Sequence, residues 1–234
     1  MSGYNKIKLI CFDLDDTLWP CMPTIIKAEN RLYQWLCLHK PAITRRYSLE
    51  DLRLKRLALA SQRADIKHNL TELRKASLRA LCAEFNDDSG WVDDAFDVFY
   101  KARQEVEFYA DVEPVLSCLK EKYHLASITN GNADIHRTSL GHLFDYAFAA
   151  ETAGAAKPDA TMFMALVKTA AVSADEVLFI GDHPVDDIEA SRAAGMTNIW
   201  LNRQAMQWPH ESFKPDHSLQ TLYEILPLLG LDRI

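Results

Sequence analysis

Short apolar runs alternate with helical patterns from residue 111 to the end of the chain. Continuously apolar runs separated by helices are typical of parallel strands, because the helices cover both faces of such a sheet. The alternation predicts strands at 125–129, 146–149, 177–180 and 198–201. It predicts helices at 114–122, 133–140, 159–171, 185–194 and 219–229. The expected fold class is α/β with a parallel sheet.

The N-terminal part of the chain adds one strand and then changes character. Residues 7–18 read as an apolar strand that ends in carboxylates, whereas helical patterns alone follow from residue 23 to about 107. We therefore expect a core domain of residues 1–18 and 108–234, into which residues 19–107 are inserted as an all-helical domain. An insert that follows the acid-bearing strand directly is well placed to serve as a lid.

Local signals place the helices of this insert. Apolar residues repeat at helical spacing over 25–36, and Pro41 ends that segment. Ser48 and Asp51 form a capping-box pattern at the start of the next helix. A third helical pattern covers 73–85, and a fourth begins at Val92.

Length, charge and cysteine content narrow the classes of protein. The chain has 234 residues, 48% of them hydrophobic, which is enough for one large domain or for a core plus an insert. A formal net charge of −7 argues against general nucleic-acid binding, which needs a basic surface. Five cysteines without a C-x-x-C pair indicate reduced thiols in a cytoplasmic protein. No apolar run approaches the roughly 20 residues that span a bilayer, so no membrane partner is expected. A monomer and a homodimer fit equally well.

Carboxylates follow the first strand at once. Asp13 and Asp15 are two residues apart, so their side chains begin on the same face of an extended strand. Two such acids repel each other unless a cation or a shared proton holds them. Because ligands bind at the carboxyl edge of open α/β sheets, the pair predicts a metal-assisted site there. A plain strand end with an Asx-type turn is the alternative.

The strand end at 129 and the loop at 157 add polar groups. Thr129, Asn130 and Gly131 offer a hydroxyl, an amide and turn-forming N–H groups that suit an anion, although an ordinary turn has the same composition. Lys-Pro pairs occur at positions 40, 157 and 214. Position alone selects Lys157, because it lies between two polar strand ends.

The strand that ends at Gly181 brings more carboxylates. Asp182 follows an apolar strand and a glycine, which is hard to explain by structure alone. Asp186 and Asp187 are open to two interpretations, since acidic residues also favour the first turn of a helix.

In order along the chain, these segments resemble the motifs of the haloacid dehalogenase superfamily. Asp13-x-Asp-x-Thr, Thr129, Lys157 with Pro158, and Gly-Asp-x₄-Asp are similar to its motifs one to four. The resemblance implies a Rossmann-like core with a type-one helical cap inserted after motif one. Dehalogenases proper lack an Asp at the position of Asp15, whereas phosphatases have it. The chain therefore resembles the phosphatase branch.

The resemblance and the chemistry of phosphate esters suggest a role for each residue. Phosphate-monoester hydrolysis is very slow without a catalyst, and a covalent aspartyl-phosphate splits it into two displacements. We expect Asp13 to be the nucleophile and Asp15 to be the general acid and then the general base. Thr129 and Asn130 would hold the phosphoryl oxygens, with Gly131 in support, and Lys157 would neutralise their charge.

The site contains four acids and one lysine, namely Asp13, Asp15, Asp182, Asp187 and Lys157. We therefore expect a metal ion to balance the excess negative charge. Oxygen ligands without nearby Cys or His suit Mg²⁺. By resemblance, Asp13 and Asp182 bind it by their side chains and Asp15 by its backbone carbonyl. Asp187 binds through water or orients Lys157. Thr17 is a supporting residue, and the roles of Asp186 and His183 stay open.

The sequence of the helical insert gives fewer indications of the substrate than the motifs give of the reaction. Trp19, Pro20 and Cys21 are expected at the mouth of the cleft. Residues 40–63 hold seven basic side chains, which steer anions or, as the favoured interpretation, form a solvated helix face. A moderate-sized cap should admit small phosphorylated metabolites and exclude polymers.

The motif sequences are also similar to those of bacterial phosphatases that act on FMN or on 5-amino-6-(5-phospho-D-ribitylamino)uracil. Two alternatives to a phosphatase remain open. One is a phosphomutase on the same scaffold, and the other is a non-catalytic protein that binds a phosphorylated metabolite.

Overall fold

The computed structural model describes residues 4–232, which divide into two compact units. The chain up to Pro20 and from Glu107 onward forms the core unit, and Cys21–Val106 form the helical unit. Each unit has a hydrophobic cluster of its own.

The core unit is built on a parallel sheet, which confirms the predicted fold class. Within the described residues the sheet has six strands in the order β3-β2-β1-β4-β5-β6. Every neighbouring pair is parallel. The strands are β1 (Leu9–Phe12), β2 (His124–Thr129), β3 (Tyr146–Ala149), β4 (Val177–Gly181), β5 (Thr197–Leu201) and β6 (His217–Leu219). Because β1 and β4 lie side by side at the centre, their carboxyl ends bring residues 13 and 182 to the same edge.

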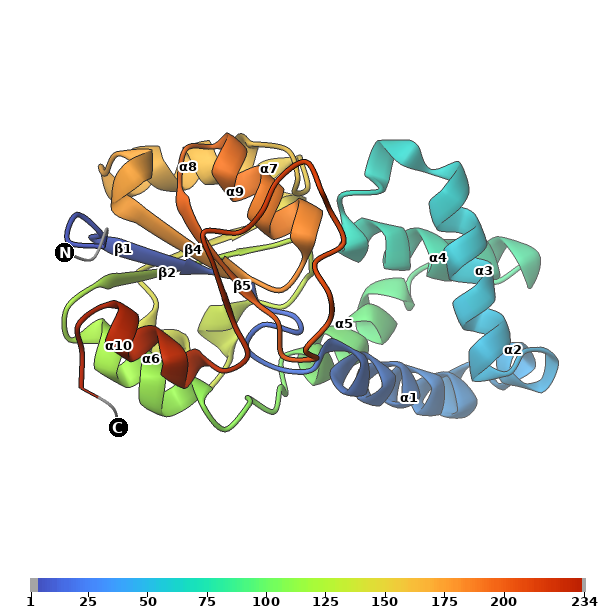
Figure 1. Cartoon of the computed structure of the whole chain (residues 1–234). Helices are drawn as coiled ribbons and strands as arrows, with labels where there is room; N and C mark the ends of the chain where they lie inside the picture. Colours follow the sequence, from blue (N-terminus) through green and yellow to red (C-terminus); the bar gives the residue numbers. More distant parts are fainter. Residues whose placement is uncertain (1–3, 233–234) are drawn as a thin grey trace. The chain divides into compact units, whose positions relative to one another are not determined.

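Helices cover both faces of this sheet, as Figure 1 shows, with α7, α8 and α9 on one face and α6 and α10 on the other. Their bounds are α6 (Val112–Lys120), α7 (Ala150–Ala153), α8 (Thr161–Ala170), α9 (Ala190–Ala193) and α10 (Ile225–Leu228). Alternate residues of β1, Leu9 and Cys11, pack in one cluster with Phe163 of α8. Burial on both faces explains why the strand is apolar without a break.

Two predicted helices of the core are wrong in whole or in part. The segment 133–140 forms only one short 3-10 turn, at Ile135–Arg137, and a second such turn follows it at Gly141–Leu143. Asp134 accepts a hydrogen bond from the His136 N–H and so favours a turn, and Gly141 lies against the backbone of Ile135, where a Cβ atom would not fit. At 219–229, Leu219 is the last residue of β6, a 3-10 turn follows at Leu222–Glu224, and the α-helix covers only Ile225–Leu228.

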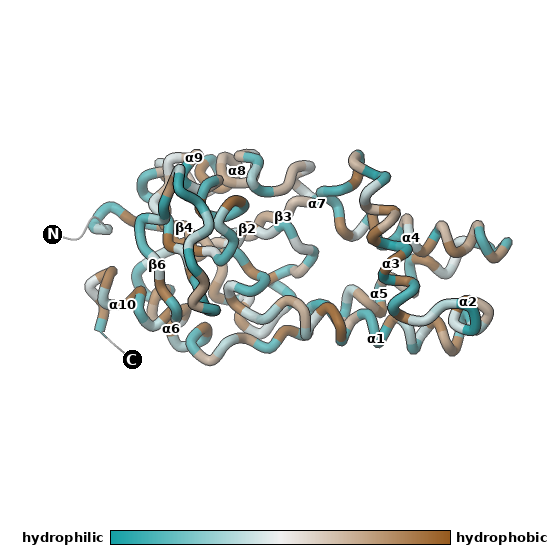
Figure 2. The backbone as a smooth tube through the Cα atoms, turned by 45° about the vertical axis from the view of Figure 1, so that its right-hand side comes forward, coloured by the Kyte–Doolittle hydropathy of each residue, from teal (hydrophilic) through white to brown (hydrophobic). Residues whose placement is uncertain are grey.

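The helical unit contains α1 (Cys21–His39), α2 (Pro41–Arg46), α3 (Leu49–Gln62), α4 (Leu70–Glu84) and α5 (Val92–Arg103). Figure 2 shows hydrophobic and hydrophilic residues alternating along these helices. The Ser48–Asp51 capping box at the start of α3 is confirmed. Pro41 ends α1 as predicted, but it also begins the unpredicted helix α2, because its missing N–H is tolerated in a first turn. Among residues 4–232, no helix is both long and apolar enough to cross a membrane.

Candidate active site

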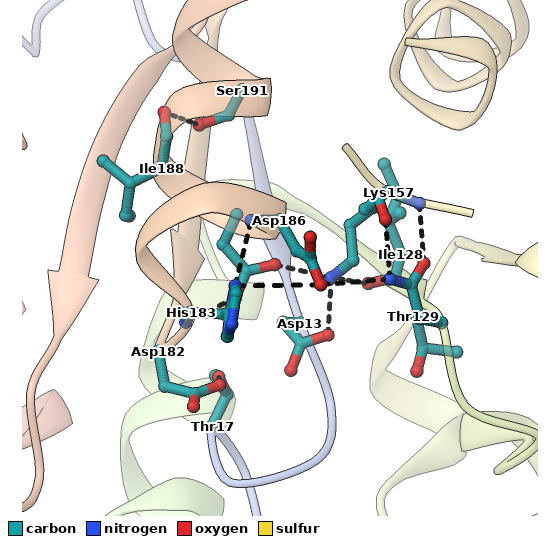
Figure 3. Close-up of polar contacts among 12 residues, drawn as sticks. Asp13, Thr17, Ile128, Thr129, Lys157, Asp182, His183, Asp186, Ile188 and Ser191 are labelled. Atoms are coloured by element: carbon teal, nitrogen blue, oxygen red, sulfur yellow. Dashed lines mark hydrogen bonds and ion pairs between the residues drawn. The ribbon is translucent and has the colours of Figure 1, made fainter. Parts of the chain in front are cut away.

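An ion pair between Asp13 and Lys157 lies at the centre of the carboxyl edge. Asp13 directly follows β1, and its N–H donates to Ile180 O at 2.9 Å, which continues the strand pairing. Lys157 Nζ donates to Asp13 Oδ1 and to Asp187 Oδ1, each at 2.6 Å, and to Ile128 O at 3.1 Å. Figure 3 shows the Lys157 ammonium beside Asp13 and Ile128. All three ammonium donors are therefore engaged within the protein, and Lys157 fixes the orientation of Asp13.

Asp182 follows β4 and is held from two sides. The Thr17 hydroxyl donates to its Oδ1 at 3.1 Å, and the Trp200 indole N–H donates to its backbone oxygen at 2.7 Å. Carboxylate oxygens of Asp13, Asp182 and Asp187 lie within 4.8 Å of one another. These hard oxygen donors fit a small divalent cation, and all three acids line one cleft with Asp15.

The pKa shifts in the cluster of Asp13, Asp182 and Asp187 indicate an excess of negative charge. Burial raises the pKa of Asp13 well above its ordinary value, and the charges of Asp187 and Asp182 add to this against the opposing Lys157. Burial and the Asp187 charge also raise the pKa of Asp182 to about 7. Burial alone would lower the pKa of Lys157, but the charges of Asp13 and Asp187 outweigh it and raise the value. A bound cation would relieve the repulsion among the acids.

Asp187 is committed to holding its neighbours. One of its oxygens accepts from Lys157, and the other accepts from the His183 backbone N–H at 2.9 Å. The carboxylate packs against Gly181 so closely that a Cβ atom there would overlap it. This contact explains why glycine precedes Asp182. Of the two roles expected for Asp187, the geometry favours orientation of Lys157.

The Thr129–Gly131 turn lies on the opposite side of Asp13 from Asp182, as Figure 3 shows for Thr129. The Thr129 hydroxyl accepts from the Gly131 N–H at 2.9 Å. The Asn130 amide is paired with the backbone of Lys157, accepting from its N–H at 2.7 Å and donating to its carbonyl at 2.9 Å. Asn130 therefore anchors the Lys157 loop by its side chain, a function that the sequence did not reveal.

Asp15 is positioned by a residue that the sequence placed elsewhere. The Trp19 indole N–H donates to Asp15 Oδ1 at 2.8 Å. Trp19 was expected at the mouth of the cleft, but it is fully buried and packs edge-on against Phe108. That expectation is wrong because the tight turn that begins at Asp16, whose φ is 59°, folds Trp19 back beneath the loop. Trp19 fixes the carboxylate instead of lining the entrance.

A second unpredicted support fixes Thr17. The Arg203 Nε donates to Thr17 O at 3.0 Å, and its two terminal nitrogens donate to the two oxygens of Asp111, each at 3.0 Å. The bidentate pair holds the guanidinium in one orientation. Arg203 and Asp111 thus support the residue whose hydroxyl holds Asp182. Local sequence patterns carry no signal for a contact between residues so far apart.

His183 and Asp186 line the same cleft without a central contact. His183 Nδ1 accepts from the Asp186 N–H at 3.0 Å and so caps the π-helical turn Pro184–Glu189. Asp186 accepts a long contact of 3.4 Å from Asn130. The cleft has a volume of about 190 Å³. It brings together most of the predicted site residues, namely Asp13, Asp15, Thr129, Asn130, Gly131, Lys157, Asp182 and Asp187.

Comparison with known proteins defines the class that this fold and cleft represent. The family model of the haloacid dehalogenase-like hydrolases matches residues 7–195. The chain belongs to this family of hydrolases.

Two relatives match nearly the whole chain. One is the 5-amino-6-(5-phospho-D-ribitylamino)uracil phosphatase YigB of Escherichia coli strain K12, with 28% identity over 96% of this chain and 97% of the relative. The other is a crystal structure of 2-haloacid dehalogenase from Pseudomonas syringae pv. Tomato DC3000, with 35% identity and a TM-score of 0.87 over 96% of this chain and 98% of that one. A phosphatase structure from Thermococcus onnurineus, at 22% identity and a TM-score of 0.67 over 97% of this chain and 100% of that one, shares the fold.

Proposed function

We propose that the protein is a Mg²⁺-dependent phosphatase that hydrolyses small phosphate monoesters through an aspartyl-phosphate on Asp13. One observation carries the proposal. Asp13 is fixed by Lys157 at 2.6 Å in a cleft that also holds a second acid, Asp15, two residues further on. A nucleophilic carboxylate and a separate proton donor are the two groups that cleavage of a phosphate ester needs.

The proposed reaction assigns one step to each group. Lys157 binds Asp13 Oδ1, so we assign Oδ2 to attack phosphorus. Asp15, held by the Trp19 indole, donates a proton to the leaving alkoxide and then accepts one from the water that hydrolyses the aspartyl-phosphate. The Thr129 hydroxyl, whose oxygen accepts from the Gly131 N–H, donates to a phosphoryl oxygen, while Asn130 acts by anchoring Lys157.

The donor set fits Mg²⁺. In the proposal the side chains of Asp13 and Asp182 and the backbone carbonyl of Asp15 hold the ion, and Asp187 orients Lys157. Mg²⁺ would screen the negative charge of the phosphate and the acids. Without that charge a phosphate dianion would enter a cleft lined by Asp13, Asp182 and Asp186 against strong repulsion.

Dehalogenation is the second candidate, because the 35% identical solved structure is of a 2-haloacid dehalogenase. The chemistry of the leaving group argues against it here. A halide ion leaves without a proton, so Asp15 would have no task, whereas an alkoxide requires one. Asp15 and the indole that holds it therefore favour an ester substrate.

The first candidate substrate is 5-amino-6-(5-phospho-D-ribitylamino)uracil, because the relative that acts on it matches nearly the whole chain. FMN has a similar phosphorylated side chain and is the second. The expected compartment remains the cytoplasm, in keeping with the five free thiols in the described part of the chain.

The test is release of phosphate and of halide by the same preparation. We expect Mg²⁺-dependent phosphate release from the two candidate substrates, its loss in Asp13→Asn and in EDTA, and no halide from 2-chloropropionate. Asp159→Asn is the matched control, because Asp159 is an exposed acid whose Oδ1 accepts from the Thr161 N–H, and the Asn oxygen can accept as well. Halide release with no phosphate would replace the proposal by dehalogenation. Isomerisation of a sugar phosphate without phosphate release would indicate a mutase, and ligand binding with no turnover would indicate a binding protein.

A further inference from the structure

The basic stretch of the helical unit does not form a purely solvated face. Arg53 and Arg56 of α3 turn toward Glu29 of α1, whose side chain is only 2% exposed. Arg53 donates to Glu29 Oε2 at 2.9 and 2.6 Å, and Arg56 approaches Glu29 Oε1 at 2.7 Å. The charged groups therefore gather inside the helical unit.

Positive charge exceeds negative charge in this cluster. Arg74 of α4 is a third guanidinium, and it reaches Glu29 Oε1 only at 3.5 Å. Glu50 also pairs with Arg53 at 2.7 Å, but its side chain is 60% exposed. Counting both carboxylates against the three guanidinium groups leaves one positive charge without a partner charge among these residues.

Arg74 carries most of this imbalance. Its side chain is 10% exposed, and its guanidinium carbon lies 3.5 Å from the centre of the Phe99 ring. Burial, followed by the charge of Arg56, lowers the pKa of Arg74 to about 9. A buried cation that is weakly paired is costly, and a bound anion would offset that cost.

A cavity of about 30 Å³ adjoins the cluster. The three arginines, Glu29, Tyr33 and Ser77 form its polar side, on which three positive groups face one carboxylate. Leucines from α1, α3 and α4 form the rest, namely Leu32, Leu36, Leu49, Leu52, Leu78 and Leu81. A cavity of this size holds roughly two or three water-sized groups. Its walls match a molecule that has an anionic end and a short apolar end. All of its lining residues belong to the helical unit, whereas the acid cleft belongs to the core unit.

We infer that this cavity is a binding site for a short-chain carboxylate, with the carboxylate on Arg56 and Arg74 and the alkyl group on the leucines. A carboxylate accepts several guanidinium hydrogen bonds, and a single methyl group, as in acetate, suits the small apolar volume. The inference does not depend on the proposed phosphatase activity, because the site shares no residue with the acid cleft.

The test is a titration of ¹⁵N-labelled full-length protein with sodium acetate in metal-free buffer, followed through the arginine Nε–Hε signals. We expect saturable shifts of the wild-type signals and at least about tenfold weaker binding in Arg56→Gln, the loss of one charge-assisted hydrogen bond. Ser77→Leu, which fills the cavity, should abolish binding. Arg63→Gln is the matched control, because Arg63 follows α3 and pairs with exposed Asp65 outside the cavity, and it should bind as the wild type does.

Several outcomes would overturn the inference. Linear, unsaturable shifts of the wild type at 50-fold excess over the protein and beyond would show that the cavity holds water alone. Equal affinity in Arg56→Gln or in Ser77→Leu would place binding elsewhere. Chloride has no alkyl group, so equal signal shifts with sodium chloride and with the carboxylate would show that the leucines do not contribute to binding. Because no turnover is measured, a failure of the proposed phosphatase activity leaves this result unaffected.

Discussion

The two units of the protein bury ion clusters of opposite composition. At the edge of the sheet, the carboxylates of Asp13, Asp182 and Asp187 surround one ammonium group, whereas in the helical unit three guanidinium groups surround the Glu29 carboxylate. The core cluster lacks positive charge and the helical cluster lacks negative charge. This difference shows that the core cluster suits a cation together with an anionic substrate. The helical cluster suits an anion alone.

Removing Lys157, the central cation of the core cluster, should have the largest effect on stability and activity. In Lys157→Met, Asp13 and Asp187 lose their buried partner. We expect the free energy of unfolding to fall by about 3 kcal/mol or more, and phosphate release to fall by at least about 100-fold. Urea unfolding and steady-state kinetics measure the two. Lys168→Met, at an exposed position on α8, should change neither. A stable and active Lys157→Met protein would show that the core cluster does not need its ammonium group.

Removing the central anion should have the next largest effect. In Glu29→Gln the three arginines lose their shared carboxylate, and we expect a loss of about 2–3 kcal/mol in the free energy of unfolding. Glu50→Gln makes the same chemical change on the exposed partner of Arg53 and should cost less than about 1 kcal/mol. Urea midpoints of the two variants give the comparison. Equal losses would mean that burial of Glu29 is irrelevant.

Metal binding should stabilise the protein by a smaller amount. At ten times its dissociation constant Mg²⁺ should add about 1.4 kcal/mol to the free energy of unfolding. Thermal unfolding with and without EDTA measures this change. Asp182→Asn should abolish it, whereas Arg56→Gln should retain it. Stabilisation of Asp182→Asn equal to that of the wild type would place the ion elsewhere.

The smallest expected effect is on the pH dependence of stability. Burial raises the pKa of Glu29, but the hydrogen bond from Arg53 and the charges of Arg56 and Arg74 outweigh it, so the pKa lies below its ordinary value of 4.5. The unfolded chain then binds the proton more readily, and the contribution of Glu29 is present above pH 4.5 and is lost as the pH falls through the lowered value. The difference in urea midpoint between wild type and Glu29→Gln should therefore shrink below that pH. A constant difference would contradict the lowered pKa.

The sheet and the acidic residues at its edge were predictable because they depend on local patterns. Apolar runs identify parallel strands, and the carboxyl ends of neighbouring parallel strands meet at one edge. Asp13 and Asp182 follow two such strands, and the structure brings them together. Their order along the chain also carried the family resemblance.

The supports of these residues were not predictable, since each joins positions that are distant or hidden in the fold. Arg203 reaches Thr17, and Asn130 reaches the backbone of Lys157. The cluster around Glu29 joins three helices, so the basic residues of 40–63 considered alone suggested a solvated face. At 133–140 the helical pattern failed because the close approach of Gly141 to an earlier turn depends on tertiary packing.

The most direct measurement of the proposed mechanism is the site of phosphorylation during turnover. Asp15→Asn should slow hydrolysis of the intermediate, and borohydride reduction of the acid-quenched protein should convert a phosphorylated aspartate to homoserine. The proposed mechanism predicts homoserine at position 13 by peptide mass spectrometry, only when Mg²⁺ and substrate are both present. An unmodified Asp13 in a preparation that releases phosphate, or modification at another aspartate, would contradict it.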